Sequence, residues 1–386
     1  MIRFCQSAIF LLLLVAAVVT GCRHAAYDPR LEEIDRVIAQ SPDSALALLD
    51  RISADSLPEA DRNLYNLLSI KARDKGNFDI ASDSIILAVL DYYSLHNKDS
   101  YAGEAMYYGG RVYCDIGDYP KALEKFQTAL EIEKSKKNSH KLPACIYSQI
   151  GWIHNAVRNY HEAEQYLIKA IENDRFLKDT LSTIYDLELL GTIKMHQKQY
   201  ETADSIFRLI LKMSENRYPT LSANQQMFLA RISYLNKDLK TALDRIRPVV
   251  NNVHDFDKGE ALIIAVDIYL KNGINDTAYL YARELVDKTK SNNKKLGYLR
   301  LLSPELRVFS SQEEIDSFIS AYYKEIERYM STNGDRAALI QNSQYNYRLH
   351  DMARAKAEKD SVRYKNWVIV ILMTLLLFIS LFFYHD

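Results

Sequence analysis

Glycine and proline, the residues that most often interrupt helices, are scarce in this sequence of 386 residues, with 12 and 8 copies. Alanine, leucine, lysine and glutamate are abundant instead, which is typical of long helices joined by short turns. Neither sign of charge predominates, because 49 basic residues stand against 50 acidic ones. The near-zero net charge excludes the global positive field that would indicate a nucleic-acid partner. The composition therefore predicts an all-α protein that binds no nucleic acid.

Motifs that would indicate catalysis or metal binding are also absent from the sequence. The nine histidines form no His-Glu-x-x-His pair, and the cysteines form no Cys-x-x-Cys motif. The glycines at 109 and 110 fit neither phosphate-loop pattern, and no Gly-x-Ser-x-Gly elbow occurs. We therefore expect a protein that is not an enzyme and that uses no metal and no cofactor.

The N-terminus carries an apolar stretch from Ala8 to Val19 that is followed by small residues and Cys22. This order is typical of a secretory signal sequence. Residues 19–22, Val-Thr-Gly-Cys, resemble the lipobox of bacterial lipoproteins, which implies cleavage after residue 21 and lipidation of Cys22. We predict a lipoprotein-type signal peptide over 1–21 and a lipid anchor at Cys22. An uncleaved signal anchor is the alternative.

From about residue 30 to 290 the sequence repeats with a period of 36 to 41 residues. One alanine marks each copy: Ala45, Ala81, Ala122, Ala163, Ala203, Ala242 and Ala278. The copies at 107–130, 147–170 and 187–210 resemble the tetratricopeptide repeat, a helix-turn-helix unit with a small residue in its first helix and an aromatic residue near its turn. The small positions are Gly110, Gly151 and Gly191, and the turn aromatics are Phe78, Tyr119, Tyr160 and Tyr200.

The resemblance implies a right-handed superhelical solenoid of tetratricopeptide-like helix pairs. Each pair cannot bury its apolar face alone, so neighbouring pairs stack. The period exceeds the 34 residues of the family, so we expect longer helices or loops. We assign 22–332 to the solenoid, and we expect a capping helical pair from about 293 to 328.

The two cysteines of the repeats, Cys114 and Cys145, lie on neighbouring first helices in this register. Their positions differ by about ten residues along the repeat, or about 15 Å of helix rise. A disulfide requires α-carbons within about 7 Å. We therefore predict two half-buried thiols without a disulfide.

The concave surface of such a solenoid, lined by the first helices, is the expected binding surface for a protein or peptide partner. Most of the 27 tyrosines are expected in packing instead. The repeat register predicts eight groove residues: Tyr107, Arg111, Trp152, Asn155, Tyr185, Glu188, Arg231 and Tyr234. This mixture of aromatic, Arg and Asn side chains suits a polypeptide ligand. The two-carboxylate clamp for acidic C-terminal peptides, known in some members of the family, is not recognisable.

The C-terminal part is predicted to be a basic juxtamembrane helix over 333–366 that leads into a transmembrane helix over 367–384. The latter contains eighteen uncharged residues, about 27 Å as a helix, with aromatic residues at both ends. In the juxtamembrane helix, which we call the stalk, Tyr345, Leu349 and Met352 keep a 4-then-3 spacing only briefly. This gives weak support for a homodimer through the stalk helix.

Two rules disagree about topology. The lipobox implies export, which favours an inner-membrane protein whose repeats face the periplasm. Six basic residues precede the span and none follows it, so the positive-inside rule favours cytoplasmic repeats. We expect the periplasmic orientation, because lipidation of Cys22 requires export, and we keep a cytoplasmic tail-anchored scaffold as the alternative.

Taken together, these features predict a non-catalytic, membrane-anchored scaffold that binds a protein or peptide on its concave surface. The combination of lipobox, repeats, basic helix and span also resembles the sensor half of membrane-bound repeat-containing regulators. This resemblance implies the second alternative, a sensor component whose output domain is missing or on another chain. The repeat motif itself indicates binding and does not specify the ligand.

Overall fold

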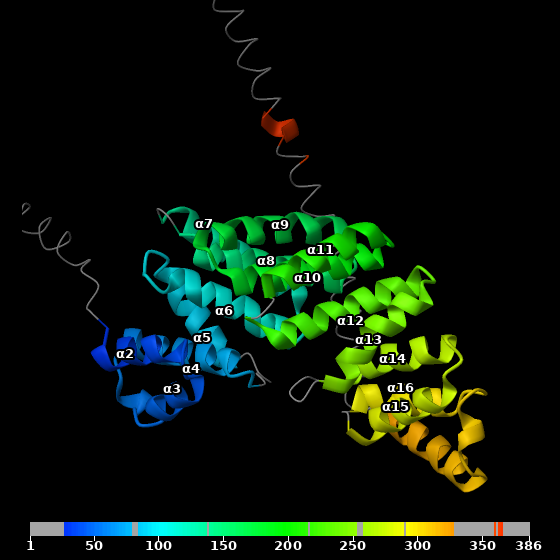
Figure 1. Ribbon diagram of the computed structural model, residues 1–386. Helices are drawn as coiled ribbons and strands as arrows, with labels where there is room; N and C mark the ends of the chain where they lie inside the picture. The colour runs from blue at the N-terminus through cyan, green and yellow to red at the C-terminus, as the bar shows by residue number, and fades with distance from the viewer. Residues whose placement is uncertain are drawn as a thin grey trace, which may run out of the picture. The chain divides into compact units, whose positions relative to one another are not determined.

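The computed structural model describes residues 27–78, 84–136, 139–214, 217–252, 258–288, 291–327, 359 and 362–365. Within these ranges every regular element is a helix (Figure 1). The chain divides into two compact units. The first contains the residues up to 116 together with 124–137, and the second contains 117–123 and the residues from 138 onward. The prediction of an all-α, tetratricopeptide-like solenoid is confirmed.

The first unit is built from helices that pack in sequence order, with α4 contacting α2, α3, α5 and α6. Its elements are α2 (Pro29–Ile38), α3 (Pro42–Leu49), η1 (Ala54–Ser56), α4 (Glu59–Lys75), α5 (Ser84–Leu95), α6 (Ala102–Asp115) and the later part of α7 (Tyr119–Lys134). Leu64, Leu67 and Tyr93 have no exposed surface. They form part of an apolar core between the helices.

A half-buried ion triad also joins three helices of the first unit. The Nζ atom of Lys71 on α4 lies 2.7 Å from a carboxylate oxygen of Asp35 on α2 and 2.7 Å from one of Glu104 on α6. Burial lowers the pKa of Lys71, but the two carboxylates outweigh this effect and the net shift is upward. The triad therefore holds a charged lysine between the helices.

The second unit continues the helix pairs, and each helix contacts its neighbours in the sequence. Its elements are α8 (Lys141–Ala156), α9 (Tyr160–Leu177), α10 (Thr180–His196), α11 (Tyr200–Ser214), α12 (Pro219–Leu235), α13 (Leu239–Asn252), α14 (Lys258–Lys271), α15 (Asn275–Lys288), α16 (Ser291–Leu301), η2 (Arg307–Phe309) and a helix over 312–327. First helices also contact one another, as in α8 with α10 and α12 with α14. This pattern is the stacking expected of repeats.

The marker alanine occupies the same place in each described copy, the fourth residue of the second helix. Its side chain has no exposed surface in Ala45, Ala122, Ala163, Ala203, Ala242 and Ala278. Ala81 lies outside the described residues. The turn aromatics Tyr119, Tyr160 and Tyr200 are the first residues of their second helices. The repeat register read from the sequence is therefore the register of the structure.

Glycine is required in the first helix because the second helix approaches it closely. A Cβ atom at Gly191 would lie 2.8 Å from Cε1 of Phe207. The Phe126 ring would meet a Cβ atom at Gly110 in the same way. Phe126 and Phe207 each follow their marker alanine by four residues, so the ring of one helix fills the space left by the glycine of the other.

The turn between the two helices of a pair reverses the chain through one left-handed residue. Its φ angle is 61° at Arg158, 61° at Lys198 and 64° at Lys237, and glycine takes this place at 117 and 273. The hydrogen bond from the Asp238 amide to the Ser233 carbonyl, 2.9 Å, closes the last helical turn. This is the Schellman arrangement, in which the left-handed residue satisfies carbonyl groups at the helix end.

The cysteine prediction is confirmed in its main point, since Cys114 and Cys145 form no disulfide. It is wrong in one detail, because Cys114 is only 5% exposed and thus buried. Its position on the core side of α6, among Val112 and Tyr113, explains the difference.

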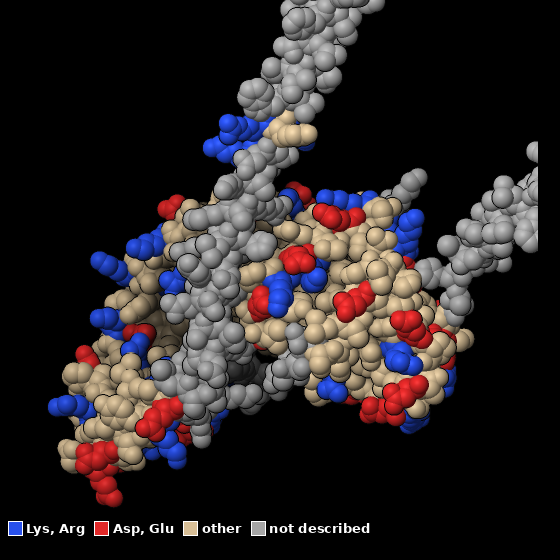
Figure 2. All heavy atoms as spheres, turned by 180° about the vertical axis from the view of Figure 1, so that it is seen from behind, with Lys and Arg blue, Asp and Glu red and all other residues tan. Residues whose placement is uncertain are grey.

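The predicted membrane attachments lie largely outside the described residues. Cys22 and the apolar run 367–384 are not among them, and of the stalk only residue 359 and residues 362–365 are described, in helical conformation. In the described ranges, no helix combines the length and the apolar character needed to cross a bilayer. Acidic and basic side chains are interspersed over the face drawn in Figure 2, in line with the net charge of −1.

Candidate binding groove

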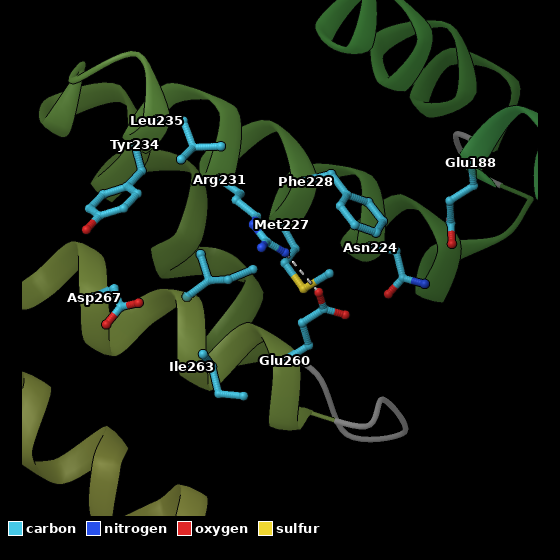
Figure 3. A pocket seen from close by; sticks show the side chains of 11 residues that line it. Glu188, Asn224, Met227, Phe228, Arg231, Tyr234, Leu235, Glu260, Ile263 and Asp267 are labelled. Carbon is cyan, nitrogen blue, oxygen red and sulfur yellow. Dashed lines mark hydrogen bonds and ion pairs between the residues drawn. The ribbon is translucent and has the colours of Figure 1, made fainter. Parts of the chain in front are cut away.

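Three successive first helices of the second unit, α10, α12 and α14, line a groove of about 640 Å³. Its lining consists of Glu188, Asn224, Met227, Phe228, Arg231, Tyr234, Leu235, Glu260, Ile263, Ile264 and Asp267. Figure 3 shows the side chains of α12 and α14 facing each other across the groove, with Glu188 of α10 near one end and Tyr234 and Asp267 near the other. We call this surface the α12 groove.

Helical spacing explains why these side chains share one surface. On α12 they recur three and four residues apart, from Asn224 to Leu235, and on α14 they run from Glu260 to Asp267 in the same way. The start of α10 is fixed by Asp179, whose carboxylate accepts a hydrogen bond from the Ser182 amide at 3.0 Å. Proline at the first position of α12, Pro219, favours helix initiation there.

The floor of the α12 groove is apolar. Met227, Phe228 and Ile264 are nearly covered by the neighbouring helices. The Phe228 ring stacks on Phe207 with a centroid distance of 4.7 Å. Ile263 and Leu235 are less covered, so the groove offers apolar surface to a ligand.

Three of the six polar side chains that line the α12 groove are acidic, and one is basic. Arg231 Nη1 lies 3.3 Å from Glu260 Oε1, as the dashed line in Figure 3 marks. Asp267 Oδ1 lies 2.7 Å from Nε of Arg300 on α16. Glu188 Oε2 accepts a hydrogen bond from Gln225 Nε2 at 2.6 Å.

Burial is the main cause of the pKa shifts in the α12 groove. It raises the pKa of Glu188; the Gln225 hydrogen bond opposes the shift, and the Glu260 carboxylate adds to it. Burial also raises the pKa of Tyr234, with a further contribution from Asp267. The pKa of His196, at the end of α10, is lowered by burial and then by nearby arginines.

The structure brings three of the eight predicted groove residues together, namely Glu188, Arg231 and Tyr234. Trp152 and Tyr185 are exposed on α8 and α10, at 40% and 53%, but do not line the α12 groove. The Trp152 ring meets the edge of Tyr119 at a centroid distance of 5.9 Å. Asn155 is half-buried near the end of α8.

The other two predicted residues belong to the first unit, and both take part in packing. Tyr107 is 7% exposed and contacts the Phe126 ring with a centroid distance of 5.8 Å. Its buried side chain does not present a free binding surface. Arg111 Nη2 lies 2.8 Å from Asp74 Oδ1, so this arginine joins α6 to α4.

The sequence reasoning missed most of the groove lining: Asn224, Met227, Phe228, Leu235, Glu260, Ile263, Ile264 and Asp267. A signal was present on α12, because steps of three, four and seven residues from Arg231 reach four of them. For α14, the lack of the glycine and turn aromatic of the motif hid the register of the first helix.

Comparisons with known proteins agree with this architecture. Residues 101–175 match the tetratricopeptide repeat model. No curated protein sequence matches the chain.

Several solved structures share the fold. The apo form of RapI aligns with a TM-score of 0.62 at 14% identity, covering 86% of this chain and 98% of that one. NprR in complex with its cognate peptide NprX aligns with a TM-score of 0.54 at 17% identity, covering 85% of this chain and 98% of that one. A signal transduction ATPase with a tetratricopeptide repeat sensor, from Pyrococcus horikoshii, aligns with a TM-score of 0.59 at 18% identity. The alignment covers 81% of this chain and 48% of that one.

Proposed function

We propose that this chain is a non-catalytic binding protein that holds a segment of a protein or peptide partner in the α12 groove. The observation that carries the proposal is the groove itself. It joins an apolar floor to a few polar groups that can orient a main chain, and these are the features of a ligand site. Its walls come from three successive repeats, so an extended segment can contact all three.

The solved structures support a peptide as the ligand class. NprR, which shares the fold, has been crystallised with its cognate peptide. An identity of 17% shows that the two chains share the fold, but it does not show which residues correspond. The binding residues that we propose are therefore taken from the α12 groove alone, and the likeness to NprR supports only a peptide as the class of ligand.

Selection from a random peptide library on the purified full chain, held in detergent micelles, tests this proposal. A selected peptide is then measured by fluorescence polarisation with wild-type chain and with two variants. Ile263→Ser removes apolar surface from the α12 groove, and Ile168→Ser does the same on α9, where the side chain is 43% exposed. We expect about tenfold weaker binding for the first variant, since about 1.5 kcal/mol of burial is lost, and no change for the second. Equal affinity for all three proteins would contradict the proposal.

We also propose that the chain is attached to the inner membrane through a lipid at Cys22 and a helix over 367–384, with its repeats in the periplasm. The support is the sequence: a lipobox-like stretch before Cys22 and eighteen uncharged residues near the C-terminus. Mass spectrometry of the N-terminal peptide tests the lipid. Protease digestion of intact spheroplasts tests the orientation, with a cytoplasmic protein as the control. Full protection of the repeats would favour the cytoplasmic tail-anchored scaffold.

A further inference from the structure

The charges of the α12 groove are unevenly matched. Of its three carboxylates, Glu260 pairs with Arg231 and Asp267 pairs with Arg300. In the part of the chain that the structure describes, no lysine or arginine forms an ion pair with Glu188, and its carboxylate is held by an uncharged amide, that of Gln225, at 2.6 Å. One half-buried negative charge therefore remains without a cation at the end of the groove.

Hydrogen-bond acceptors also outnumber donors at this end. Oδ1 of Asn224 is buried and has no hydrogen-bond partner among the described residues, and the same holds for Oε1 of Gln225. Gln225 has no exposed surface, and its other amide atom is the one that donates to Glu188. Asn224 points into the α12 groove between Glu188 and Glu260 (Figure 3). The partial negative charges of these unpaired oxygens add to that of the Glu188 carboxylate, so this end favours a positively charged ligand group.

The adjoining floor suits the stem of a long side chain. Phe228 and Met227 lie beside Asn224 in the α12 groove (Figure 3). The apolar part of a lysine or arginine packs on such a surface while its charged end reaches a carboxylate. An aromatic ring next to the cation adds a favourable electrostatic contact. An acidic side chain would instead meet Glu188 and Glu260, and the one cation of the lining, Arg231, already has a partner.

We propose that the α12 groove selects a polypeptide segment with a basic side chain, and that Glu188 is the residue that pairs with its ammonium or guanidinium group. The inference rests on the proposed function, because it names the chemistry of the segment that the groove would hold. Arginine fits best, since its planar guanidinium can donate two parallel hydrogen bonds to the Glu188 carboxylate. Glu188 thus determines specificity, while the apolar floor supplies affinity that does not depend on charge.

The first test is the composition of the peptides selected from the random library on the full chain. We expect lysine and arginine to be enriched at one position, and aspartate and glutamate to be depleted there. The second test uses the best such peptide and an analogue in which glutamine replaces its basic residue. Both are measured with wild-type chain, with Glu188→Gln, and with Glu201→Gln on the exposed side of α11 as the matched control.

We expect Glu188→Gln to weaken binding of the basic peptide about tenfold, as for a charge-assisted pair, and to leave the analogue unaffected. Unchanged binding of the analogue also demonstrates that the variant is folded. Glu201→Gln should bind both peptides like the wild-type chain. If the selected peptides show no basic position, or if Glu188→Gln binds the basic peptide as the wild-type chain does, the inference is wrong while the binding function stands. If no peptide is selected, both proposals fail.

Discussion

Replacing Asp186 by asparagine is expected to stabilise the folded chain, and the gain should grow as the pH rises. Asp186 on α10 and Asp174 on α9 are each 4% exposed, and they are close enough to titrate together. The Ser148 hydroxyl on α8 donates to Asp186 Oδ1 at 2.5 Å. Neither carboxyl forms an ion pair with a lysine or arginine of the described residues, and Asp179 adds a further negative charge near Asp174. The pair therefore retains a proton at a pH where an exposed carboxyl would lose it.

The expected magnitude follows from the raised pKa. Burial, followed by the Asp174 carboxyl, raises the pKa of Asp186 to about 7 against the opposing Ser148 hydrogen bond, from an ordinary value of 3.8. Because the folded-state pKa is the higher one, the folded form binds the extra proton, and its stability falls as the pH rises from about 4 through about 7. The slope is about 1.4 kcal/mol per pH unit, so the limit is about 4 kcal/mol above pH 7. Asparagine carries no charge and can still accept the Ser148 bond, so we expect it to recover about 2 to 4 kcal/mol at pH 8.

Thermal unfolding of the full chain in detergent, followed from pH 5 to pH 8, measures this effect. The melting temperature of Asp186→Asn should exceed that of the wild-type chain by several degrees at pH 8 and by clearly less at pH 5. Asp316→Asn, at an exposed position of the helix over 312–327, is the matched control and should give no pH-dependent difference. A stabilisation of equal size at both pH values, or a loss at pH 8, would refute the shared proton.

Three further predictions concern the repeat itself. Gly191→Ala should destabilise the chain by about 1 to 3 kcal/mol in chemical denaturation, because the added methyl group overpacks the space beside the Phe207 ring. A more stable variant would contradict this prediction. Lys237→Gly should stabilise the chain by about 0.5 to 1 kcal/mol, since φ is 64° there, whereas Lys240→Gly in the first turn of α13 should not stabilise it. An equal stabilisation by both variants would refute the turn argument. Iodoacetamide at pH 8 should label Cys145 well before Cys114 in the native chain, because burial raises the pKa of Cys114 to about 12. In urea, peptide mass spectrometry should find both cysteines labelled at the same rate. Equal rates in the native chain would contradict the burial of Cys114.

The sequence alone was sufficient for the repeat register. The marker alanine recurs because the fourth residue of each described second helix is fully buried, as at Ala163 and Ala203. Such requirements are local and periodic, so they leave a pattern in one sequence. The turn aromatics, the helix pairs and the all-α class follow from the same pattern. The lipid and membrane attachments stay predictions from the sequence.

The binding surface could be predicted only in part. Helical spacing from Arg231 leads to Phe228, yet nothing in the sequence shows that Glu260 lies opposite on α14. Tyr107 has the register of a groove residue, but the Phe126 ring covers it. The choice between packing and exposure depends on which side chains the neighbouring repeat supplies. Those partners are distant in the sequence and follow no period.

The sequence by itself thus determined the helices and their order, because the spacing of small and aromatic residues is imposed by contacts within each repeat and its neighbour. Only the tertiary structure decided which charges are matched. Arg111 is held by Asp74, Glu260 by Arg231 and Asp267 by Arg300, whereas Glu188 is held by an amide alone. Ion pairing depends on distances of a few ångströms between side chains about 30 or more residues apart, and such distances exist only once the helices have stacked.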